Sequence, residues 1–319
     1  YRKTAGTLLR ALLSRIDGEL SVLSVMGRGY MPIQTIRRAP GAIAGGLRGR
    51  AIALGLFALA VATPAAATTG WSPSVSALYK LRIAGIELAS FNFTSTVRGE
   101  AYTLAGHGKL SWGLGLYKYD GKFTGTGTLA GDGVRPATYA YDWKVNKKSG
   151  SVRLGFDRGS VHKVEIQPPH TSSPDVVPLK PEHLMSVFDP LTALIALSRY
   201  RGGDPCDRRI ALFEGKQRFD LVLTRHREEK VLEPKPSGQP VLAHICRVRY
   251  LPVAGHKANR ETQAAIKTEG IEVALRPIPS ANLLVPYRIT IPTPLGNAIL
   301  TAQTVDITGP GNKQIALTH

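Results

Sequence analysis

The chain has 319 residues, a formal net charge of +18 and two cysteines. This length suits one large β domain or two small domains. The basic excess fits nucleic acid, anionic lipid head groups or lipopolysaccharide-like phosphates as partners, and the export predicted below argues against nucleic acid. Because the charges are spread along the chain, a simply solvated surface is the alternative interpretation.

The N-terminal region has the order of segments that is typical of a secretory signal peptide. Four arginines between residues 37 and 50 precede an uncharged run of 12 residues, 51–62, and small residues continue to Ala67. The run is shorter than the about 20 residues that a membrane-spanning helix needs. We therefore predict a signal peptide over residues 31–67, cleavage after Ala67, and a periplasmic protein that does not span the membrane after cleavage. We expect residues 1–30 to be a mis-annotated or disordered leader, with an amphipathic helix over Thr7–Val25 as the alternative.

Residues 68–319 predict a single β-rich domain, because apolar and polar residues alternate with period two in many short segments. Within one such segment, Tyr139, Tyr141 and Trp143 share a face. The predicted strands of the first half include Tyr79–Ile83, Ala101–Leu104, Tyr117–Phe123, Thr138–Val145 and Val152–Phe156.

Turn residues punctuate these segments. Asp120-Gly121, Gly131-Asp132-Gly133 and Lys148-Ser149-Gly150 supply the small and polar residues that tight hairpins need. The strands do not alternate with long helices. The pattern therefore predicts an all-β, mainly antiparallel fold in the form of a curved open barrel or a β-spiral.

A proline-rich loop near residues 167–183 leads to the one capping helix that we predict, near residues 189–200. Asp189 can cap its N-terminus, and Pro190 suits the first helical position because that N–H is unpaired anyway. Gly202 and Gly203 end the helix. An apolar stripe at helical spacing, able to plug a barrel mouth or lie across an open sheet, is formed by Leu191, Leu194, Ile195 and Leu197.

The C-terminal part of the chain predicts a hairpin that turns at Glu214-Gly215-Lys216. Cys206 and Cys246 form an even pair, which in an oxidising compartment predicts one disulfide closing a loop of about 40 residues. A thiol site is the competing interpretation. The last predicted strands are Ala243–Tyr250, Ile271–Arg276, Tyr287–Ile291 and Ala298–Ile307.

Motifs for catalysis or metal binding are absent from the sequence. It has neither a G-x-S-x-G elbow nor a P-loop, and no two histidines have the H-x-x-x-H spacing. We therefore expect no catalytic residue, no metal site and no cofactor. An enzyme that hydrolyses envelope glycans or lipids is the alternative, because paired carboxylates need not be close in sequence.

Aromatic residues gather in the first half of the predicted domain. On curved antiparallel strands they could line a concave apolar cavity of the kind that holds lipids in barrel-type carriers. The alternative is that they simply fill the core, as aromatic residues do in β proteins. With the helix included, the candidate lining residues are Trp112, Tyr117, Tyr119, Phe123, Tyr139, Tyr141, Trp143, Leu191, Leu194 and Ile195.

Four stretches of the chain are characteristic in combination, namely Tyr79–Ile86, Phe188–Leu194, Cys206 with Phe213–Asp220, and Cys246 with Tyr250–Gly255. Through them the sequence resembles the DUF3108 family of exported bacterial proteins over residues 75–300. The resemblance implies export and a β-rich spiral or open-barrel fold, similar to periplasmic lipoprotein carriers and envelope-integrity proteins. It implies no catalytic residue.

We therefore expect a periplasmic, non-catalytic binding or scaffold protein that supports cell-envelope integrity. Its curved sheet would hold an apolar or lipid-like ligand, and its partner would be a lipid or another envelope component. Besides the hydrolase, a structural module that binds partners through exposed strand edges or proline-rich loops is an alternative.

Overall fold

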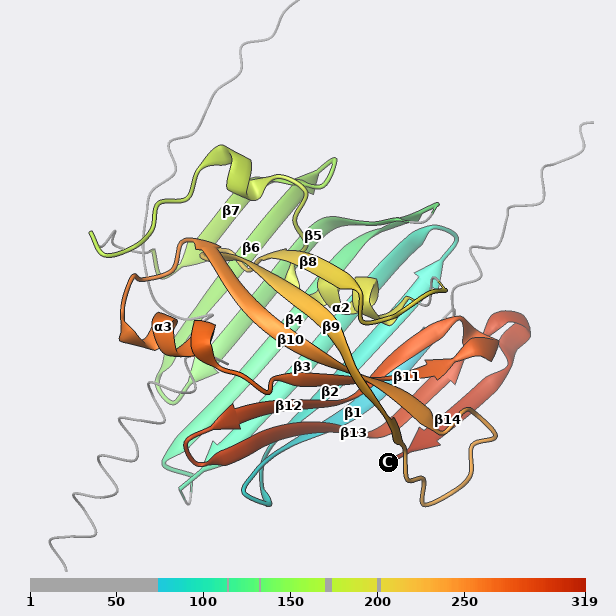
Figure 1. Ribbon diagram of the computed structural model, residues 1–319. Coiled ribbons are helices and arrows are strands. Elements are labelled where there is room, and N and C mark those ends of the chain that lie inside the picture. The colour runs from blue at the N-terminus through green and yellow to red at the C-terminus, as the bar shows by residue number, and fades with distance from the viewer. Residues whose placement is uncertain (1–73, 114, 132, 170–173, 200–201) are drawn as a thin grey trace, which may run out of the picture.

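Figure 1 shows the computed structural model of the protein, which describes residues 74–113, 115–131, 133–169, 174–199 and 202–319. The predicted leader, signal peptide and cleavage point lie outside these residues. All pairings between the strands of the described part are antiparallel. The prediction of an all-β, mainly antiparallel fold is therefore confirmed.

The strands and helices have the following bounds in chain order. The first seven strands are β1 (Ser74–Ile83), β2 (Ile86–Arg98), β3 (Ala101–Trp112), β4 (Tyr117–Ala130), β5 (Gly133–Val145), β6 (Lys148–Asp157) and β7 (Ser160–Gln167). The later strands are β8 (Arg208–Phe213), β9 (Arg218–Lys230), β10 (Leu242–Ala254), β11 (Glu272–Ile278), β12 (Leu283–Thr293), β13 (Gly296–Thr308) and β14 (Gln314–Thr318). The helical segments are η1 (Pro181–Leu184), α2 (Pro190–Ser198), α3 (Arg260–Lys267), η2 (Pro279–Ala281) and η3 (Pro310–Asn312).

One sheet contains all of these strands. β1 to β7 form an up-and-down meander, and β8 to β13 form a second meander that joins the first where β13 pairs with β1. β14 pairs with the far half of β13, beyond the part that pairs with β12. The end strands β7 and β8 do not pair with each other, so the sheet is open, as predicted, rather than a closed barrel.

The sheet curls so that its two halves face each other. In Figure 1, β8, β9 and β10 cross in front of the first meander, and α2 lies between the two layers. The helix contacts β4 and β5 on one side and β8 and β12 on the other. It therefore acts as the plug of the open, curled sheet, which is one of the two roles predicted for it.

Alternation of side chains gives the first meander an apolar inner face and a polar outer face. On the inner face, Phe123 of β4 lies opposite Tyr141 of β5. On the outer face, the preceding residue Lys122 lies opposite Asp142. The inner face supplies much of the main core, including the fully buried Leu104 and its neighbours on β3 to β6. The alternation of apolar and polar residues thus decides which face of the first meander the second meander covers.

The helix α2 begins as its sequence predicts. The Asp189 carboxylate accepts hydrogen bonds from the backbone N–H groups of Leu191 and Thr192, both at 3.0 Å, and Pro190 occupies the first turn. The helix ends at Ser198, two residues earlier than predicted. Before it, the end of the predicted proline-rich loop forms the short 3₁₀ helix η1.

A second helix, α3, was not predicted. Asn259 caps it by accepting a hydrogen bond from the backbone N–H of Thr262 at 3.0 Å. None of its residues is buried, so its sequence has no apolar stripe against a core to mark it as a helix.

Two predicted turns are wrong. Asp120-Gly121 lies inside β4, and Lys148-Ser149-Gly150 opens β6, because the actual turn lies at Asn146-Lys147, where Asn146 has a φ of 52°. The glycines serve a different purpose. A Cβ on Gly150 would lie 2.5 Å from the ring of Trp143, and one on Gly121 would lie 2.6 Å from Cζ of Tyr119. These glycines therefore make room for aromatic rings that lie across the sheet.

Candidate functional site

The inner face of the first meander is a layer of aromatic rings over small residues. A Cβ on Gly108 of β3 would lie 2.5 Å from the ring of Phe91, so that ring lies flat against the backbone of the neighbouring strand. Phe123 and Tyr141 stack with ring centroids 4.5 Å apart and planes 4° from parallel. The flat rings keep the apolar layer thin and leave room above it for α2 and for the second meander.

The structure separates the ten candidate lining residues into three groups. Four belong to the buried core, namely Tyr139, Tyr141, Leu191 and Ile195. Two pack against that core while partly buried, namely Phe123 and Trp143. The other four are also partly buried and lie at the margins, namely Trp112, Tyr117, Tyr119 and Leu194.

A small cavity lies beneath α2, where the sequence predicts a ligand chamber. Its walls are apolar and include Leu194, Ile195, Tyr79 and Phe93, and its volume is about 40 Å³. A space of this size holds about one water molecule. The cavity under the helix is therefore too small for a lipid, and most of the aromatic layer there acts as core.

Buried polar residues tie the start of α2 to the sheet. Thr192 donates a hydrogen bond from Oγ1 to the Asp189 carboxylate at 2.5 Å, and its hydroxyl lies 2.8 Å from the hydroxyl of Tyr102 on β3. Burial raises the pKa of Asp189 to about 6, although the hydrogen bonds from Thr192 and Leu191 oppose this shift. Burial also raises the pKa of Tyr102.

A second group of buried polar residues lies in the turn between β8 and β9. Burial raises the pKa of Glu214 to about 7 and lowers the pKa of Lys216 to about 8, and each charge counteracts the shift of the other. Oε1 of Glu214 accepts a hydrogen bond from the backbone N–H of Gln217 at 2.8 Å. In the described residues its Oε2 has no hydrogen-bond partner.

Tyr139 lies within the electrostatic reach of both groups. Burial raises its pKa well above the usual value, and the charges of Asp189 and Glu214 add to that effect. Its hydroxyl also has no hydrogen-bond partner among the described residues. The curled sheet thus encloses two carboxylates and a tyrosine at the core, in a place that solvent does not reach.

The sequence did not single out Glu214, Lys216, Tyr102 or Thr192 as site residues. Two charged residues beside a glycine in a hairpin ordinarily indicate a solvated turn. The only available signal was that Phe213–Asp220 is among the stretches that resemble a known family.

A much larger cleft lies on the other side of the sheet, at the ends of β2 to β5. Its volume is about 660 Å³, which is within the range of roughly 300–1,000 Å³ for small-molecule sites. Leu88 contributes apolar surface to its wall. Ala89, Leu110 and Tyr119 also border it, but the strand register places their side chains on the inner face with Phe123. Three lysines from adjacent strands also line it, namely Lys109, Lys118 and Lys144.

The carboxylates that line this cleft are engaged with other side chains. Glu87 forms ion pairs with Lys80 at 3.0 Å and with Arg82 at 3.2 Å. Asp120 lies 3.1 Å from His107. Within the described residues, no carboxylate forms an ion pair with the three cleft lysines. The cleft therefore combines available positive charge with a small apolar surface at Leu88.

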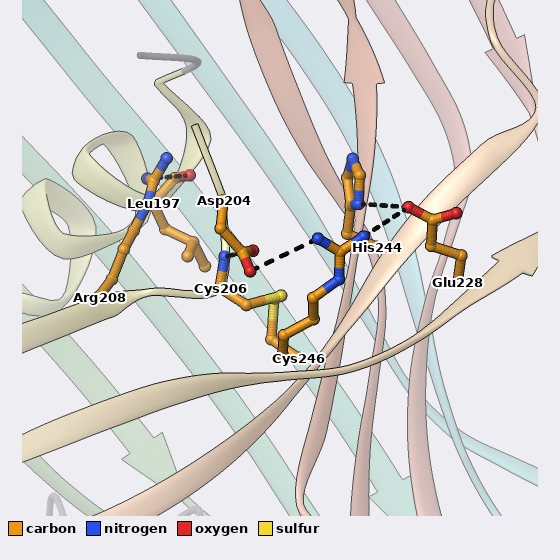
Figure 2. The surroundings of a disulfide bond; sticks show 8 residues. Leu197, Asp204, Cys206, Arg208, Glu228, His244 and Cys246 are labelled. Atoms are coloured by element: carbon orange, nitrogen blue, oxygen red, sulfur yellow. Dashed lines mark hydrogen bonds and ion pairs between the residues drawn. A yellow bond between two sulfur atoms is a disulfide. The ribbon is translucent and has the colours of Figure 1, made fainter. Parts of the chain in front are cut away.

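The predicted disulfide is present, and no free cysteine remains for the alternative thiol site. Cys206 and Cys246 are both fully buried and join the segment before β8 to β10. Figure 2 shows a chain of polar contacts beside the bond. Asp204 accepts a hydrogen bond from the backbone N–H of Cys206 at 2.9 Å, and Glu228 lies 3.4 Å from Nδ1 of His244. The bond fixes the segment that connects α2 to β8 onto strand β10.

The described part of the chain offers neither a metal site nor a membrane-spanning helix. In the described ranges, no three His, Cys, Asp or Glu side chains come together in a way that could hold a metal ion. No helix among those same residues has both the length and the apolar character needed to cross a membrane.

Comparisons with known proteins give one family and one remote structural neighbour. The family model described as a protein of unknown function (DUF3108) matches residues 78–303. A solved structure, the beta-barrel-like protein of domain of unknown function DUF1849 from Brucella abortus, is similar with a TM-score of 0.41 and 11% sequence identity, over 74% of this chain and 98% of that chain. No curated protein matches the chain.

Proposed function

This chain belongs to the DUF3108 family, whose function is unknown, and we propose that it acts as a non-catalytic binding or scaffold protein that supports cell-envelope integrity in the periplasm. Its ligand is an amphiphilic, lipid-like molecule with an anionic head group. The binding site is the cleft at the ends of β2 to β5 rather than the core beneath α2.

The observation that carries this proposal is the pairing of size and chemistry in the cleft. The space of about 660 Å³ suits a small amphiphile, whereas the cavity of about 40 Å³ under α2 does not. Lys109, Lys118 and Lys144 offer ammonium groups to a phosphate or carboxylate. Leu88 offers apolar surface to an acyl chain.

The hydrolase alternative needs titrating groups that are both tuned and accessible. The carboxylates and the lysine with strongly shifted pKa values, Asp189, Glu214 and Lys216, are buried in the core. None of them lines the cleft. The observations therefore favour binding over hydrolysis.

The periplasmic location rests on two supports. The order of basic, apolar and small residues before Ala67 is that of a signal peptide. The buried disulfide is of a kind that persists in oxidising compartments and is rare in the cytosol.

The test is calorimetric titration of the purified protein with lysophosphatidylglycerol, an anionic amphiphile, and with dodecyl maltoside, an uncharged one. We expect the anionic amphiphile to bind more tightly. The triple variant K109E/K118E/K144E should weaken its binding at least about tenfold, because three charge-assisted contacts are lost.

The matched control is K230E/K235E/K313E, which makes the same change in net charge at exposed lysines away from the cleft. This control should bind like the wild type. The proposal fails if the cleft variant also binds like the wild type, or if neither amphiphile binds.

A further inference from the structure

One end of the sheet carries four neighbouring hairpin turns, which we call the hairpin rim. They join β12 to β13, β1 to β2, β3 to β4 and β5 to β6. The strand registers place them at one end, since Ile83 lies opposite both Ile86 and Ala298, Trp112 opposite Tyr117, and Val145 opposite Lys148. In Figure 1 the rim runs along the lower-left edge of the sheet.

Apolar side chains project into solvent from three successive turns of this rim. Leu295 is 41% exposed, Ile86 is 63% exposed and Leu116 is 68% exposed. Strands lie about 4.8 Å apart, so turns separated by two strands lie roughly 10 Å apart. The three side chains therefore form a row, and the partly buried Trp112 and Tyr117 flank the last of them.

The turns at the opposite end of the first meander are polar. The β2–β3 turn is bordered by Arg98 and Glu100, and the β6–β7 turn by Asp157 and Arg158. No large apolar residue in the described parts of these two turns is exposed. Since a hairpin turn needs no leucine or isoleucine for its geometry, the row on the hairpin rim calls for an explanation other than folding.

Positive charge surrounds the same row. Lys118 follows the β3–β4 turn, and Lys147 and Lys148 form and follow the β5–β6 turn, all three of them exposed. No ion pair with a carboxylate involves these three lysines in the described part of the chain. Glu87, the acidic residue that follows Ile86, forms ion pairs with Lys80 and Arg82.

We infer that the hairpin rim docks onto the surface of an anionic lipid bilayer. Ile86, Leu116 and Leu295 enter the boundary between head groups and acyl chains, and the rim lysines contact the lipid phosphates. A row of exposed aliphatic tips with flanking aromatic residues and lysines suits this interface, since apolar burial and attraction to anionic lipids add together. The positive charge selects a membrane over an apolar protein surface as the partner.

This inference stands apart from the proposed ligand cleft. The cleft lies beside the rim, but Ile86, Leu116 and Leu295 do not line it. A rim variant can therefore lose membrane docking while keeping the amphiphile. Because Lys118 belongs to both sites, the cleft variant that separates them in the other direction is K109E/K144E, which leaves the rim lysines in place.

The test is co-sedimentation with vesicles of phosphatidylglycerol and phosphatidylethanolamine, compared with vesicles of phosphatidylcholine alone. We expect binding to the anionic vesicles, and at least about a tenfold loss of that binding in the triple variant I86S/L116S/L295S. The matched control is L232S/V241S/L242S, which removes exposed apolar side chains far from the rim and should bind like the wild type. All variants keep the same N-terminal residues, so binding through those residues would be equal.

A fluorescence measurement gives a second reading. Wild-type protein should show a blue shift of tryptophan emission on adding anionic vesicles, and Trp112→Phe should reduce that shift. Equal binding by the rim variant and the control overturns the inference, and so does equal binding to neutral and anionic vesicles. It is also overturned if the rim variant changes only self-association, seen by size-exclusion chromatography, while vesicle binding stays the same.

Discussion

Asp189 is the residue on which the docking of α2 depends most directly. It is fully buried and accepts three hydrogen bonds, from the backbone N–H groups of Leu191 and Thr192 and from the Thr192 hydroxyl. We expect Asp189→Ala to lower the free energy of unfolding by about 2–3 kcal/mol, because it removes a cap and leaves buried donors unpaired. Asp189→Asn keeps a capping oxygen and should cost less than about 1 kcal/mol. Urea unfolding at neutral pH measures both, and equal losses would contradict the role.

The raised pKa of Asp189 also predicts a pH dependence of stability. Its pKa is about 6 in the folded protein against an ordinary value of 3.8, so the folded state holds its proton more tightly. The stabilisation that this proton provides is fully present below about pH 4 and is lost as the pH rises through about 6. Relative to Asp189→Asn, the wild type should therefore lose about 1–3 kcal/mol between pH 4 and 7. Parallel curves of unfolding free energy against pH for the two proteins would refute this assignment.

At the scale of elements, the tip of the β8–β9 hairpin fastens the second meander to the first. Gly215 has a φ of 111°, and a Cβ there would lie 2.6 Å from Cγ1 of Val152 on β6. We expect Gly215→Ala to destabilise the protein by about 2–4 kcal/mol, through both backbone strain and overpacking. Gly159→Ala is the matched control, because its φ is 79° and no atom lies within 4 Å of a Cβ there. Thermal unfolding should show a clearly smaller loss for this control.

The disulfide is the second fastening between elements. Cys206 and Cys246 are separated by 40 residues, and in the chain-entropy model a bond across such a loop contributes about 3–4 kcal/mol. We expect C206A/C246A to fold but to unfold at a correspondingly lower urea concentration. Adding a reductant should lower the midpoint of the wild type and leave that of the variant unchanged. A wild type with the same midpoint before and after complete reduction would show that the bond adds nothing.

The elements that could be predicted from sequence are those whose signals are local. Period-two alternation revealed the strands, and Asp189 with Pro190 marked the start of α2. Gly121 and Gly150 misled the turn assignment because their reason is a contact between strands, where aromatic rings cross the backbone. α3 escaped notice because it buries nothing.

For the whole molecule, the sequence predicts an open curved sheet, but it does not predict which strands join the two meanders. The pairing of β1 with β13 brings together Ser74 and Thr308, and no local pattern carries that information. This pairing and the curvature of the sheet bring Glu214 of the second meander near Tyr139 of the first, in the core. The candidate lining residues therefore emerged mostly as core, while the cleft formed on the face that alternation marks as polar.

Export is the prediction that concerns the chain as a whole. If residues 31–67 are a signal peptide, the full-length chain expressed in a Gram-negative bacterium should be recovered by osmotic shock with Thr68 as its first residue. Its two cysteines should not react with a maleimide after denaturation, because the disulfide forms in the periplasm. A chain that starts at Thr68, made in the cytosol, should keep reactive thiols and unfold at lower urea, by about the contribution that the bond makes. Recovery of the full-length product in the cytosolic fraction with residues 51–67 still attached would contradict the prediction. Oxidised cysteines in the cytosolic form would remove the disulfide as support for a periplasmic protein, because the bond would then form without export.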